Sequence, residues 1–480
     1  MELEAVIGLE IHVQLATATK MFCGCALSFG EPPNTRTCAV CLGLPGSLPV
    51  ANARAVHFGL MIGLALGSEL APRSIFHRKN YFYPDLPKGY QISQYDEPLC
   101  RGGTLGEVRI HRVHLEEDAA KLIHVGSSGR IHGSDASIVD FNRGGTPLAE
   151  IVTEPDLRSP EQASEWLKLL RGTLRQLGVS DVNMEEGSLR CDANISLRPA
   201  GSQALGVKTE LKNMNSFRFI ERGIRAEIAR QQKILQGGGQ VIQETLHFDP
   251  GSGAISSLRS KEEAHDYRYF PEPDLLPVAI DAAMVAAARA DMSELPADRA
   301  ERLQRELGLS ADSARLLAFR GELGDYFEAA LAGASGAPPP QALANWLAGE
   351  LLPRLEEEGE NNDPAASRVR PQALAALVGL VASKSVSVGA ARQVLDRLVL
   401  QGGDPQAIVA EEGLAAMDGG DELLAIVAAA VAANADAAER VRQGNAKAIG
   451  PIVGQVMRET KGRADGTEVS RMINEQLGGA

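Results

Sequence analysis

The sequence predicts an α+β protein in which a large mixed domain is followed by two helical parts. The first three-fifths of the chain is rich in glycine, proline and short runs with strand-type alternation, with helical segments between them. From Ser293 the texture changes to alanine and leucine at helical spacing, and Gly402-Gly-Asp-Pro405 interrupts it a second time. We therefore expect three domains, with the bounds 1–292, 293–404 and 405–480.

The mixed domain is expected to open on a half-buried strand. Between Val6 and Leu15, apolar side chains alternate with Glu10, His12 and Gln14, which is the period of two of a strand with one covered face. The other elements expected in this domain are strands within 110–123 and at 194–197, and helices at 160–177 and 216–235, the last opened by a serine cap.

Composition and charge limit the classes of protein to which the chain can belong. Its 480 residues, 44% of them hydrophobic, suffice for two or three cores. The formal net charge of −14 argues against binding nucleic acid through bulk positive charge, so any such contact should be local or shared with a partner. The first residues lack the pattern of a secretion signal, and the apolar stretch 423–433 is too short to span a bilayer. We expect a cytoplasmic protein with no membrane contact.

The last expected domain carries a basic segment on an otherwise acidic chain. Seven lysine and arginine residues lie between Arg440 and Arg471, opposed by Glu459, Asp465 and Glu468. The segment is either a local surface that contacts phosphates or a solvated helix face, and charge alone favours the solvated face.

Four of the six cysteines form two close pairs, Cys23-Gly-Cys25 and Cys38-Ala-Val-Cys41. Two thiol pairs across a loop can supply the four sulfur ligands of a tetrahedral Zn²⁺. A site closed by four sulfurs leaves no open position, so its role would be structural.

A second possible metal site involves carboxylates. Glu10 and His12 lie two positions apart on the expected strand, so both project from the face opposite the apolar one. Taken alone, an exposed polar strand face is the more common interpretation of such a pair. In a strand, adjacent residues point to opposite faces, so only one of Glu116 and Glu117 should face a metal, and the neighbouring alternation favours Glu116.

Further acids lie in short polar motifs, and their residue types suit one kind of cation. Oxygen ligands together with one imidazole are typical of Mg²⁺ or Mn²⁺ beside phosphates. Sequence alone does not establish that these residues converge. The additional candidates are Glu150, Asp192 and Glu210.

Aromatic residues are only 4% of the chain, yet tyrosines gather in two segments. Tyr81 and Tyr83 follow Lys79 in the first segment, and Tyr267 and Tyr269 flank Arg268 in the second. Tyrosine, lysine and arginine beside turns can bind a nucleotide or a terminal adenosine through stacking and phosphate contacts. Packing of the rings at loop bases is an equally good interpretation.

Two motifs that resemble known catalytic signatures are rejected. In the segment Gly201–Thr209, a valine separates the second glycine from the lysine, so the segment does not match a phosphate-binding P-loop. Ser256-Ser257 with Lys261 lacks the glycine-rich setting of a serine–lysine amidase. A nucleophile that releases ammonia is therefore not expected in this chain.

Taken together, the motifs resemble the B subunit family of the Asp/Glu-tRNA amidotransferases. The matching segments are collinear and span the first domain, and the end of the chain resembles the family's tail module. The middle helical region matches in texture only. The segments are 8–14, the two cysteine pairs, 79–94, 114–121, 140–156, 184–194, 208–213, 259–274 and 444–462.

This resemblance implies a cradle domain with the active site, a helical domain and a tail that contacts tRNA. It also implies a heterotrimer with an amidase A subunit and a small C subunit. The A subunit would release ammonia from glutamine. In this chain, ATP would phosphorylate the side-chain carboxylate of Glu on tRNA(Gln) or Asp on tRNA(Asn), and ammonia would displace the phosphate, which makes the complex a carbon–nitrogen ligase.

Within that family frame, residue roles can be assigned as expectations. Phosphoryl transfer needs cations that neutralise the triphosphate. The sulfur site is expected to hold Zn²⁺. The expected Mg²⁺ ligands are Glu10, His12, Glu116 or Glu117, Glu150 and Glu210; the expected catalytic residues are Glu10, His12, Glu150, Asp192 and Lys79; and the expected contacts to ATP or the aminoacyl end are Tyr81, Tyr83 and Arg268.

Two other functions stay open at this stage. A zinc-containing RNA-binding module without chemistry would bind tRNA independently of ATP, but the carboxylate-rich motifs argue against it. A stand-alone Mg²⁺-dependent ligase for a small molecule would need neither tRNA nor partners, but the basic tail argues against it. Sequence does not say whether Glu-tRNA(Gln), Asp-tRNA(Asn) or both are substrates.

Overall fold

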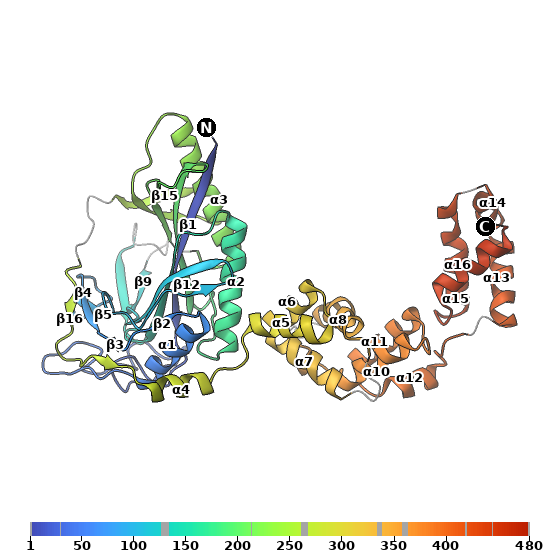
Figure 1. Ribbon diagram of the computed structural model, residues 1–480, viewed down its shortest axis with the longest axis horizontal. Helices are drawn as coiled ribbons and strands as arrows, with labels where there is room; N and C mark the ends of the chain where they lie inside the picture. Colours follow the sequence, from blue (N-terminus) through green and yellow to red (C-terminus); the bar gives the residue numbers. More distant parts are fainter. Residues whose placement is uncertain are drawn as a thin grey trace. The chain divides into compact units, whose positions relative to one another are not determined.

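The computed structural model describes residues 2–478 apart from 29, 126–133, 213, 261–266, 334–337, 358–362, 418–419 and 444. The chain divides into two compact units, Met1–Leu295 and Pro296–Ala480. The first unit is built on a mixed sheet with helices, and the second is helical (Figure 1). The predicted α+β class is therefore confirmed.

The centre of the first unit is a ten-stranded sheet within the described residues. Neighbouring strands run antiparallel, except β13 and β14, which are parallel. In sheet order the strands are β15 (Ile255–Ser260), β14 (Glu244–Phe248), β13 (Thr209–Lys212), β12 (Leu189–Pro199), β1 (Leu3–Gln14), β11 (Pro147–Thr153), β8 (Val108–Glu117), β6 (Cys100–Arg101) and β2 (Glu69–Leu70), with β7 (Thr104–Leu105) paired to β8.

The two faces of this sheet differ in polarity, as the alternation in β1 predicts. Leu9, Ile11 and Val13 are buried in one core with the helices α1 (Ala53–Ala65), α2 (Pro160–Gln176) and α3 (Phe217–Gln236). The intervening Glu10 and His12 lie on the opposite face. The helices thus cover one face of the sheet and leave the other for polar residues.

Side-chain caps explain where these helices begin. Asn52 accepts hydrogen bonds from the amides of α1, Ser159 caps α2, and Ser216 accepts from the amide of Phe219 in α3. The predicted helices at 160–177 and 216–235 are confirmed to within one residue at each end.

The expected strand region 110–123 is in fact two strands. The chain leaves the main sheet after Glu117, and β9 (Lys121–Val125) pairs with β10 (Ala136–Asp140) in a separate sheet. The change of direction is fixed by hydrogen bonds from the amide of Asp118 to Thr146 O and from Gly145 N to Asp118 O. Alternation continues through the turn, so the sequence pattern alone does not reveal the break.

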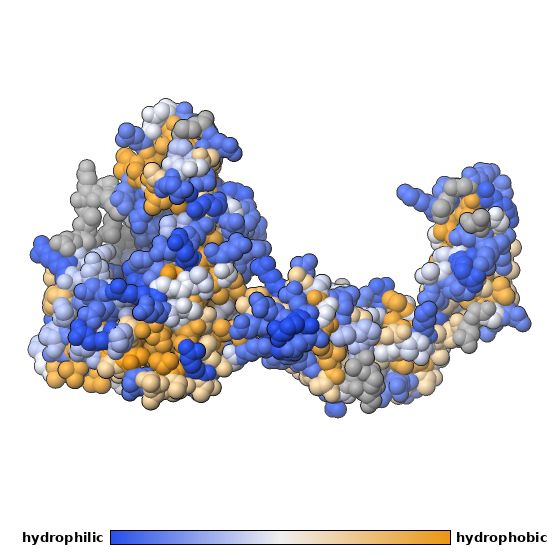
Figure 2. Space-filling model, viewed as in Figure 1, coloured by the Kyte–Doolittle hydropathy of each residue, from blue (hydrophilic) through white to orange (hydrophobic). Residues whose placement is uncertain are grey.

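Two smaller sheets and a surface helix complete the first unit. β4 (His77–Asn80) pairs with β5 (Tyr90–Ser93) and β16 (Phe270–Pro271), and β3 (Arg73–Ser74) pairs with β17 (Val278–Ala279). Helix α4 (Ala282–Ala290) lies on the surface, and its exposed alanines form part of an apolar area at the lower edge of this unit (Figure 2).

The second unit contains two hydrophobic cores. One extends from Leu303 to Leu414 and the other from Leu423 to Leu477. The elements are α5 (Pro296–Leu307), α6 (Ala311–Phe319), α7 (Gly321–Ala332), α8 (Pro340–Trp346), η2 (Leu347–Leu351), α9 (Leu352–Glu357), η3 (Pro364–Ala366), α10 (Pro371–Ala382), α11 (Val388–Gln401), α12 (Pro405–Glu412), α13 (Asp421–Ala433), α14 (Ala435–Arg442), η4 (Ala446–Ile449), α15 (Gly450–Glu459) and α16 (Gly466–Gln476). Within the described residues, no helix is both long enough and apolar enough to cross a membrane.

Candidate active site and cysteine cluster

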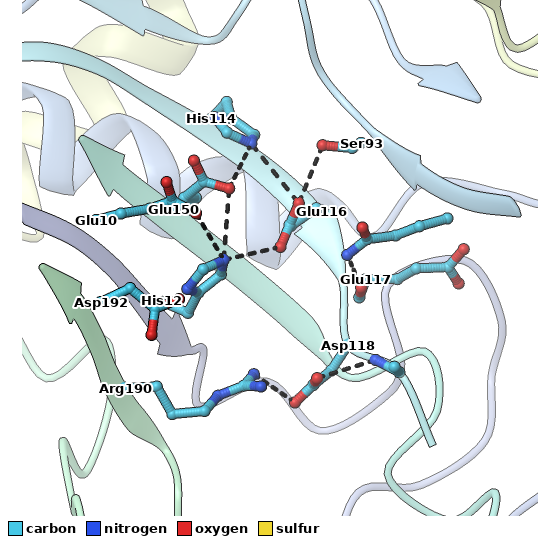
Figure 3. Close-up of polar contacts among 12 residues, drawn as sticks. Glu10, His12, Ser93, His114, Glu116, Glu117, Asp118, Glu150, Arg190 and Asp192 are labelled. Carbon is cyan, nitrogen blue, oxygen red and sulfur yellow. Dashed lines mark hydrogen bonds and ion pairs between the residues drawn. The ribbon is translucent and has the colours of Figure 1, made fainter. Parts of the chain in front are cut away.

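The polar face of the central sheet brings together acids and imidazoles from strands that are far apart in sequence. In the register of the sheet, His12 lies opposite Glu150 of β11 on one side and Arg190 of β12 on the other. Glu10 lies opposite Asp192 of β12. Figure 3 shows His12 and Glu150 directed toward each other and toward Glu116 of β8, whereas Arg190 points to Asp118.

His12 is at the centre of this cluster. Its Nε2 lies 3.4 Å from Glu150 Oε2, 3.5 Å from Glu116 Oε1 and 3.9 Å from Glu10 Oε1. The ligand atoms of His12, Glu116 and Glu150 all lie within 4.8 Å of one another, as do those of Glu10, His12 and Asp192. We call these five residues the carboxylate cluster. Two carboxylate oxygens and one imidazole nitrogen at this spacing suit a hard divalent cation.

The charges of the cluster are strongly coupled. Burial alone would raise the pKa of Glu150, but His114 and His12 hold it well below its usual value. Burial disfavours a charge on His12, yet the hydrogen bond to Glu150 and the charge of Glu116 raise its pKa. Burial and the charge of Glu150 raise the pKa of Glu10. Carboxylates held this close are able to bind a cation.

His114 is a member of this site that the sequence did not single out. It is 2% exposed, and its Nε2 lies 3.3 Å from Glu150 Oε2 and 3.7 Å from Glu116 Oε2. Burial opposes a charge on His114, but Glu150 and Glu116 raise its pKa to about 9. The signal for His114 was its position two residues before Glu116 on a strand, which places both side chains on one face.

Adjacent residues Glu116 and Glu117 point to opposite sides of β8, as expected. Glu116 faces the cluster, where Ser93 Oγ donates to its Oε2 at 3.0 Å. Glu117 instead pairs with Lys88 and accepts from the amide of Ile92 at 3.0 Å. Because Glu117 faces away from His12, we leave it out of the proposed Mg²⁺ ligand set.

Glu210 and Asp192 share a cation that the sequence did not identify. Lys212 Nζ contacts Asp192 and lies 2.9 Å from Glu210 Oε1, and Thr245 Oγ1 donates to Glu210 Oε2 at 3.0 Å. Burial disfavours the charge of Lys212, but Asp192 and Glu210 raise its pKa. Glu210 is therefore linked to Asp192 of the cluster through Lys212, and it is not in the group formed by His12, Glu116 and Glu150.

Lys79 and two of the expected tyrosines line the same face. Lys79 Nζ lies over the ring of Tyr267 at 4.9 Å, and the rings of Tyr81 and Tyr267 are in edge contact at 6.1 Å. Burial opposes the charge of Lys79, whereas Glu116, Tyr269 and Glu150 raise its pKa. The lysine is thus held charged close to the carboxylate cluster.

The other two expected ATP contacts, Tyr83 and Arg268, lie in the loops beside β4. Tyr83 is 45% exposed in the turn after β4, lining a shallow surface hollow with Phe82 and Pro84. Arg268 has a left-handed backbone (φ 43°), and its carbonyl accepts from Asn80 Nδ2 at 2.8 Å.

Of the rejected Ser/Lys motif, Lys261 lies outside the described residues, as do 261–266 of the matched segment 259–274. The P-loop-like segment leads into strand β13 and not into a helix.

The four cysteines meet as predicted from their spacing. The Sγ atoms of Cys23, Cys25, Cys38 and Cys41 lie within 4.8 Å of one another, and none is in a disulfide. Ligands of a tetrahedral zinc at about 2.3 Å lie roughly 3.8 Å apart, so this arrangement suits a four-sulfur site. Hydrogen bonding with Cys23 lowers the pKa of Cys41 to about 4.

A fully buried lysine lies against this thiol cluster. Lys20 is 1% exposed, and its Nζ donates to Phe141 O at 3.0 Å and contacts Cys41 Sγ at 3.7 Å. A buried ammonium needs a negative partner. Thiolate sulfur is the partner that the cysteine cluster offers.

A sheet-based domain with a carboxylate cluster, a separate thiol cluster and a helical extension has the donor groups that metal-dependent group-transfer enzymes use. Comparison with known proteins identifies the family within this class. The family model described as the GatB/GatE catalytic domain matches residues 5–286, and that described as the GatB domain matches residues 325–477.

Proteins similar to this chain over nearly their whole length carry the name of the B subunit of aspartyl/glutamyl-tRNA(Asn/Gln) amidotransferase. One from Anaeromyxobacter sp. (strain K) is 49% identical over 99% of both chains. One from Frankia casuarinae is 51% identical over 99% of this chain and 96% of its own, and one from Geobacter sulfurreducens is 48% identical over 100% of both.

The chain belongs to the B subunit family of the aspartyl/glutamyl-tRNA(Asn/Gln) amidotransferases. The family predicted from the motifs is confirmed, and with it the function as one component of a tRNA-dependent amidotransferase, a glutamine-dependent ligase.

Proposed function

We propose that the polar face of the sheet is where the side-chain carboxylate of an amino acid on tRNA is phosphorylated by ATP and then amidated by ammonia. The observation that carries this proposal is the convergence of His12, Glu116 and Glu150, whose ligand atoms lie within 4.8 Å of one another. A carboxylate resists attack by ammonia because oxide is a poor leaving group. Phosphorylation replaces oxide by phosphate.

The donor set fits Mg²⁺, since it consists of carboxylate oxygens and one imidazole. We assign Glu10, His12, Glu116 and Glu150 as its ligands, with Glu210 acting through water. When bound, the cation neutralises the triphosphate and holds it in line for transfer. The residues of this chain supply the ligands for that cation and determine where the reacting carboxylate binds.

Cationic side chains around the cluster complement the negative charge of the ATP phosphates and of the substrate carboxylate. Lys79 lies beside Glu116 and Glu150, and its place over Tyr267 holds the ammonium on the open face. We propose that Lys79 contacts a transferring phosphate and that Asp192, held by Lys212, lines the aminoacyl end. Tyr81 and Tyr267 would border this end, whereas Tyr83 and Arg268 are proposed as outer contacts to the nucleotide or tRNA terminus.

Ammonia would come from glutamine hydrolysed in an A subunit, and a small C subunit would complete the heterotrimer. Beside the carboxylate cluster, a cavity of about 140 Å³ is lined by Lys88, Glu117, Lys20 and Cys41. Glu117 faces this cavity while its neighbour Glu116 faces the cluster. We propose that the cavity lies on the ammonia route and that the Glu117–Lys88 pair forms its wall.

The cysteine cluster is proposed to hold a structural Zn²⁺. Four thiolates leave no open coordination position, so the ion would fix the loop 23–41 and take no part in the chemistry. Lys20 offsets part of the negative charge of four thiolates and ties the cluster to Phe141, in the loop that leads to Glu150.

The C-terminal domain, expected at 405–480, is proposed to contact the tRNA body through its basic residues. Two of these residues pair with acids of their own helices, Arg442 with Glu439 and Arg471 with Glu468. These pairs reduce the contribution of Arg442 and Arg471, so the exposed Lys447 is the better phosphate contact. The complex would work in the cytoplasm on Glu-tRNA(Gln), Asp-tRNA(Asn) or both.

Replacing Glu10 with glutamine in the assembled complex tests the proposed site. The variant keeps the shape of the side chain but removes one ligand charge. We expect tRNA binding and glutamine hydrolysis to survive and ATP-dependent amide formation to fall by at least about 100-fold. Amide formation at the wild-type rate would overturn the metal assignment. tRNA binding without any ATP-dependent step in the wild type would favour a pure RNA-binding module.

A further inference from the structure

The two carboxylates proposed to bind the cation are each held by the same buried imidazole. His114 lies opposite Glu150 in the register of β8 and β11, and two residues before Glu116 on its own strand. Its Nε2 contacts Glu150 Oε2 at 3.3 Å and Glu116 Oε2 at 3.7 Å. Figure 3 shows the ring of His114 between these two side chains, on the far side from the partly exposed His12.

The second ring nitrogen of His114 fixes which atom faces the carboxylates. Arg112 Nε donates to His114 Nδ1 at 3.2 Å, and a guanidinium nitrogen can only donate. Nδ1 can accept this bond only when the ring is neutral, and that state leaves the proton on Nε2. An imidazolium also carries a proton on Nε2, so Nε2 is a donor to Glu150 and Glu116 in either state.

This arrangement leaves the outward oxygen of Glu116 for a cation. Its Oε2 is taken by Ser93 Oγ at 3.0 Å and by His114, while its Oε1 faces His12 at 3.5 Å. The Oε1 of Glu150 is contacted by Arg112 Nη2 at 3.4 Å. Glu116 is thus oriented by donors behind it, whereas Glu150 Oε2 is contacted by both His114 and His12. His114 is the donor common to the two carboxylates.

We propose that His114 is a positioning residue that sets the geometry of Glu116 and Glu150 for a divalent cation carrying a nucleoside triphosphate, with Arg112 fixing its ring. This inference rests on the proposed function of the carboxylate cluster. His114 does not coordinate the cation itself, because its Nε2 is occupied as a donor and the ring is buried. Partners of this kind, which orient the ligands of a metal, contribute about 10–100-fold to metal affinity or activity.

Two isosteric substitutions separate positioning from simple packing. The amide nitrogen of glutamine reaches about as far as Nε2 of histidine, whereas that of asparagine reaches only as far as Nδ1. In the assembled complex, His114→Gln should keep a donor toward Glu116 and Glu150, and His114→Asn should lose it. His111→Gln is the matched control, because His111 lies on the same strand but pairs with Glu154 outside the cluster.

The measurements are Mn²⁺ binding, followed by electron paramagnetic resonance, and the Mg²⁺ concentration that half-saturates amide formation. We expect His114→Asn to weaken Mn²⁺ binding and raise the half-saturating Mg²⁺ by about 10–100-fold. His114→Gln should stay within a few-fold of wild type, and His111→Gln should not change. Thermal unfolding of each complex identifies a variant that has lost its fold.

Equal metal requirements for wild type and His114→Asn would overturn the inference, as would equal losses in the Asn and Gln variants. If the Asn variant does not assemble, a loss of Mn²⁺ affinity of about 10-fold or more in His114→Gln overturns the inference. A loss of Mn²⁺ affinity as large as that of Glu116→Gln would contradict the positioning role. If the proposed function itself is wrong, the result is different, because amide formation by the wild-type complex would then not depend on a divalent cation.

Discussion

At the scale of single residues, the most informative side chains are buried charges whose partners reveal what else must bind. Lys20 is 1% exposed and contacts only Phe141 O and Cys41 Sγ among the polar contacts resolved for its Nζ. A methionine at this position fills similar volume without the charge, so the half-buried tetrathiolate would lose a compensating cation.

Lys20→Met should therefore weaken zinc binding by about 10–100-fold, measured as transfer of zinc to a chromophoric chelator. Lys168→Met, on the exposed face of α2, is the control and should leave transfer unchanged. The double variant Cys38→Ser, Cys41→Ser supplies the zinc-free reference. Equal zinc content in wild type and the double variant would rule out the metal, and equal transfer in wild type and Lys20→Met would rule out the role of Lys20.

Most residues of the proposed site could be predicted from the sequence, but the contacts between them could not. Glu10 and His12 were identifiable because strand periodicity fixes a common face. Their convergence with Glu150 was not, because it depends on the register of β1 against β11. His114 and Lys212 were missed because a buried histidine or a half-buried lysine is common in strands without any function.

At the scale of elements, prediction succeeded where one local pattern decides the outcome. Strand β1 and the serine-capped helices α2 and α3 follow from alternation, helical periodicity and caps, which are properties of neighbouring residues. The break after Glu117 escaped prediction because it is made by hydrogen bonds to Gly145 and Thr146, residues distant in sequence. The strand order of the sheet is likewise set by such long-range pairing.

The positions of the ligands also depend on elements outside the cluster. Glu227 of α3 is fully buried beneath β13 and accepts hydrogen bonds from Thr209 Oγ1 at 2.8 Å and Gln231 Nε2 at 2.9 Å. Thr209 lies next to Glu210 on β13. These buried hydrogen bonds hold Thr209 in place, and we infer that they help to fix the strand that presents Glu210.

At the scale of the whole molecule, the chain combines an acidic catalytic unit with a local basic surface. The net charge of −14 does not favour tRNA, so binding should depend on a few exposed residues. Lys447 of η4 and Arg458 of α15 are both exposed in the second unit. Because these two residues are not part of the carboxylate cluster, we expect their substitution to affect tRNA binding and not the chemistry.

The double variant Lys447→Glu, Arg458→Glu reverses the charge of both residues. It should raise the KM for charged tRNA about 10-fold or more and reduce the salt dependence of binding. The kcat should stay close to that of wild type. Glu439→Lys with Glu459→Lys provides a control of opposite sign, and should lower KM. A fall in kcat with an unchanged KM would contradict a role of this surface in tRNA binding.

We propose that phosphate is transferred from ATP to the aminoacyl carboxylate at the carboxylate cluster. This proposal is tested most directly by ADP formation in the assembled complex without glutamine or ammonia, with and without Glu-tRNA(Gln) or Asp-tRNA(Asn). We predict ADP formation that requires charged tRNA and Mg²⁺ in wild type, and its loss in Glu150→Gln with tRNA binding intact. ADP formation by Glu150→Gln at the wild-type rate, or formation independent of charged tRNA, would contradict this assignment.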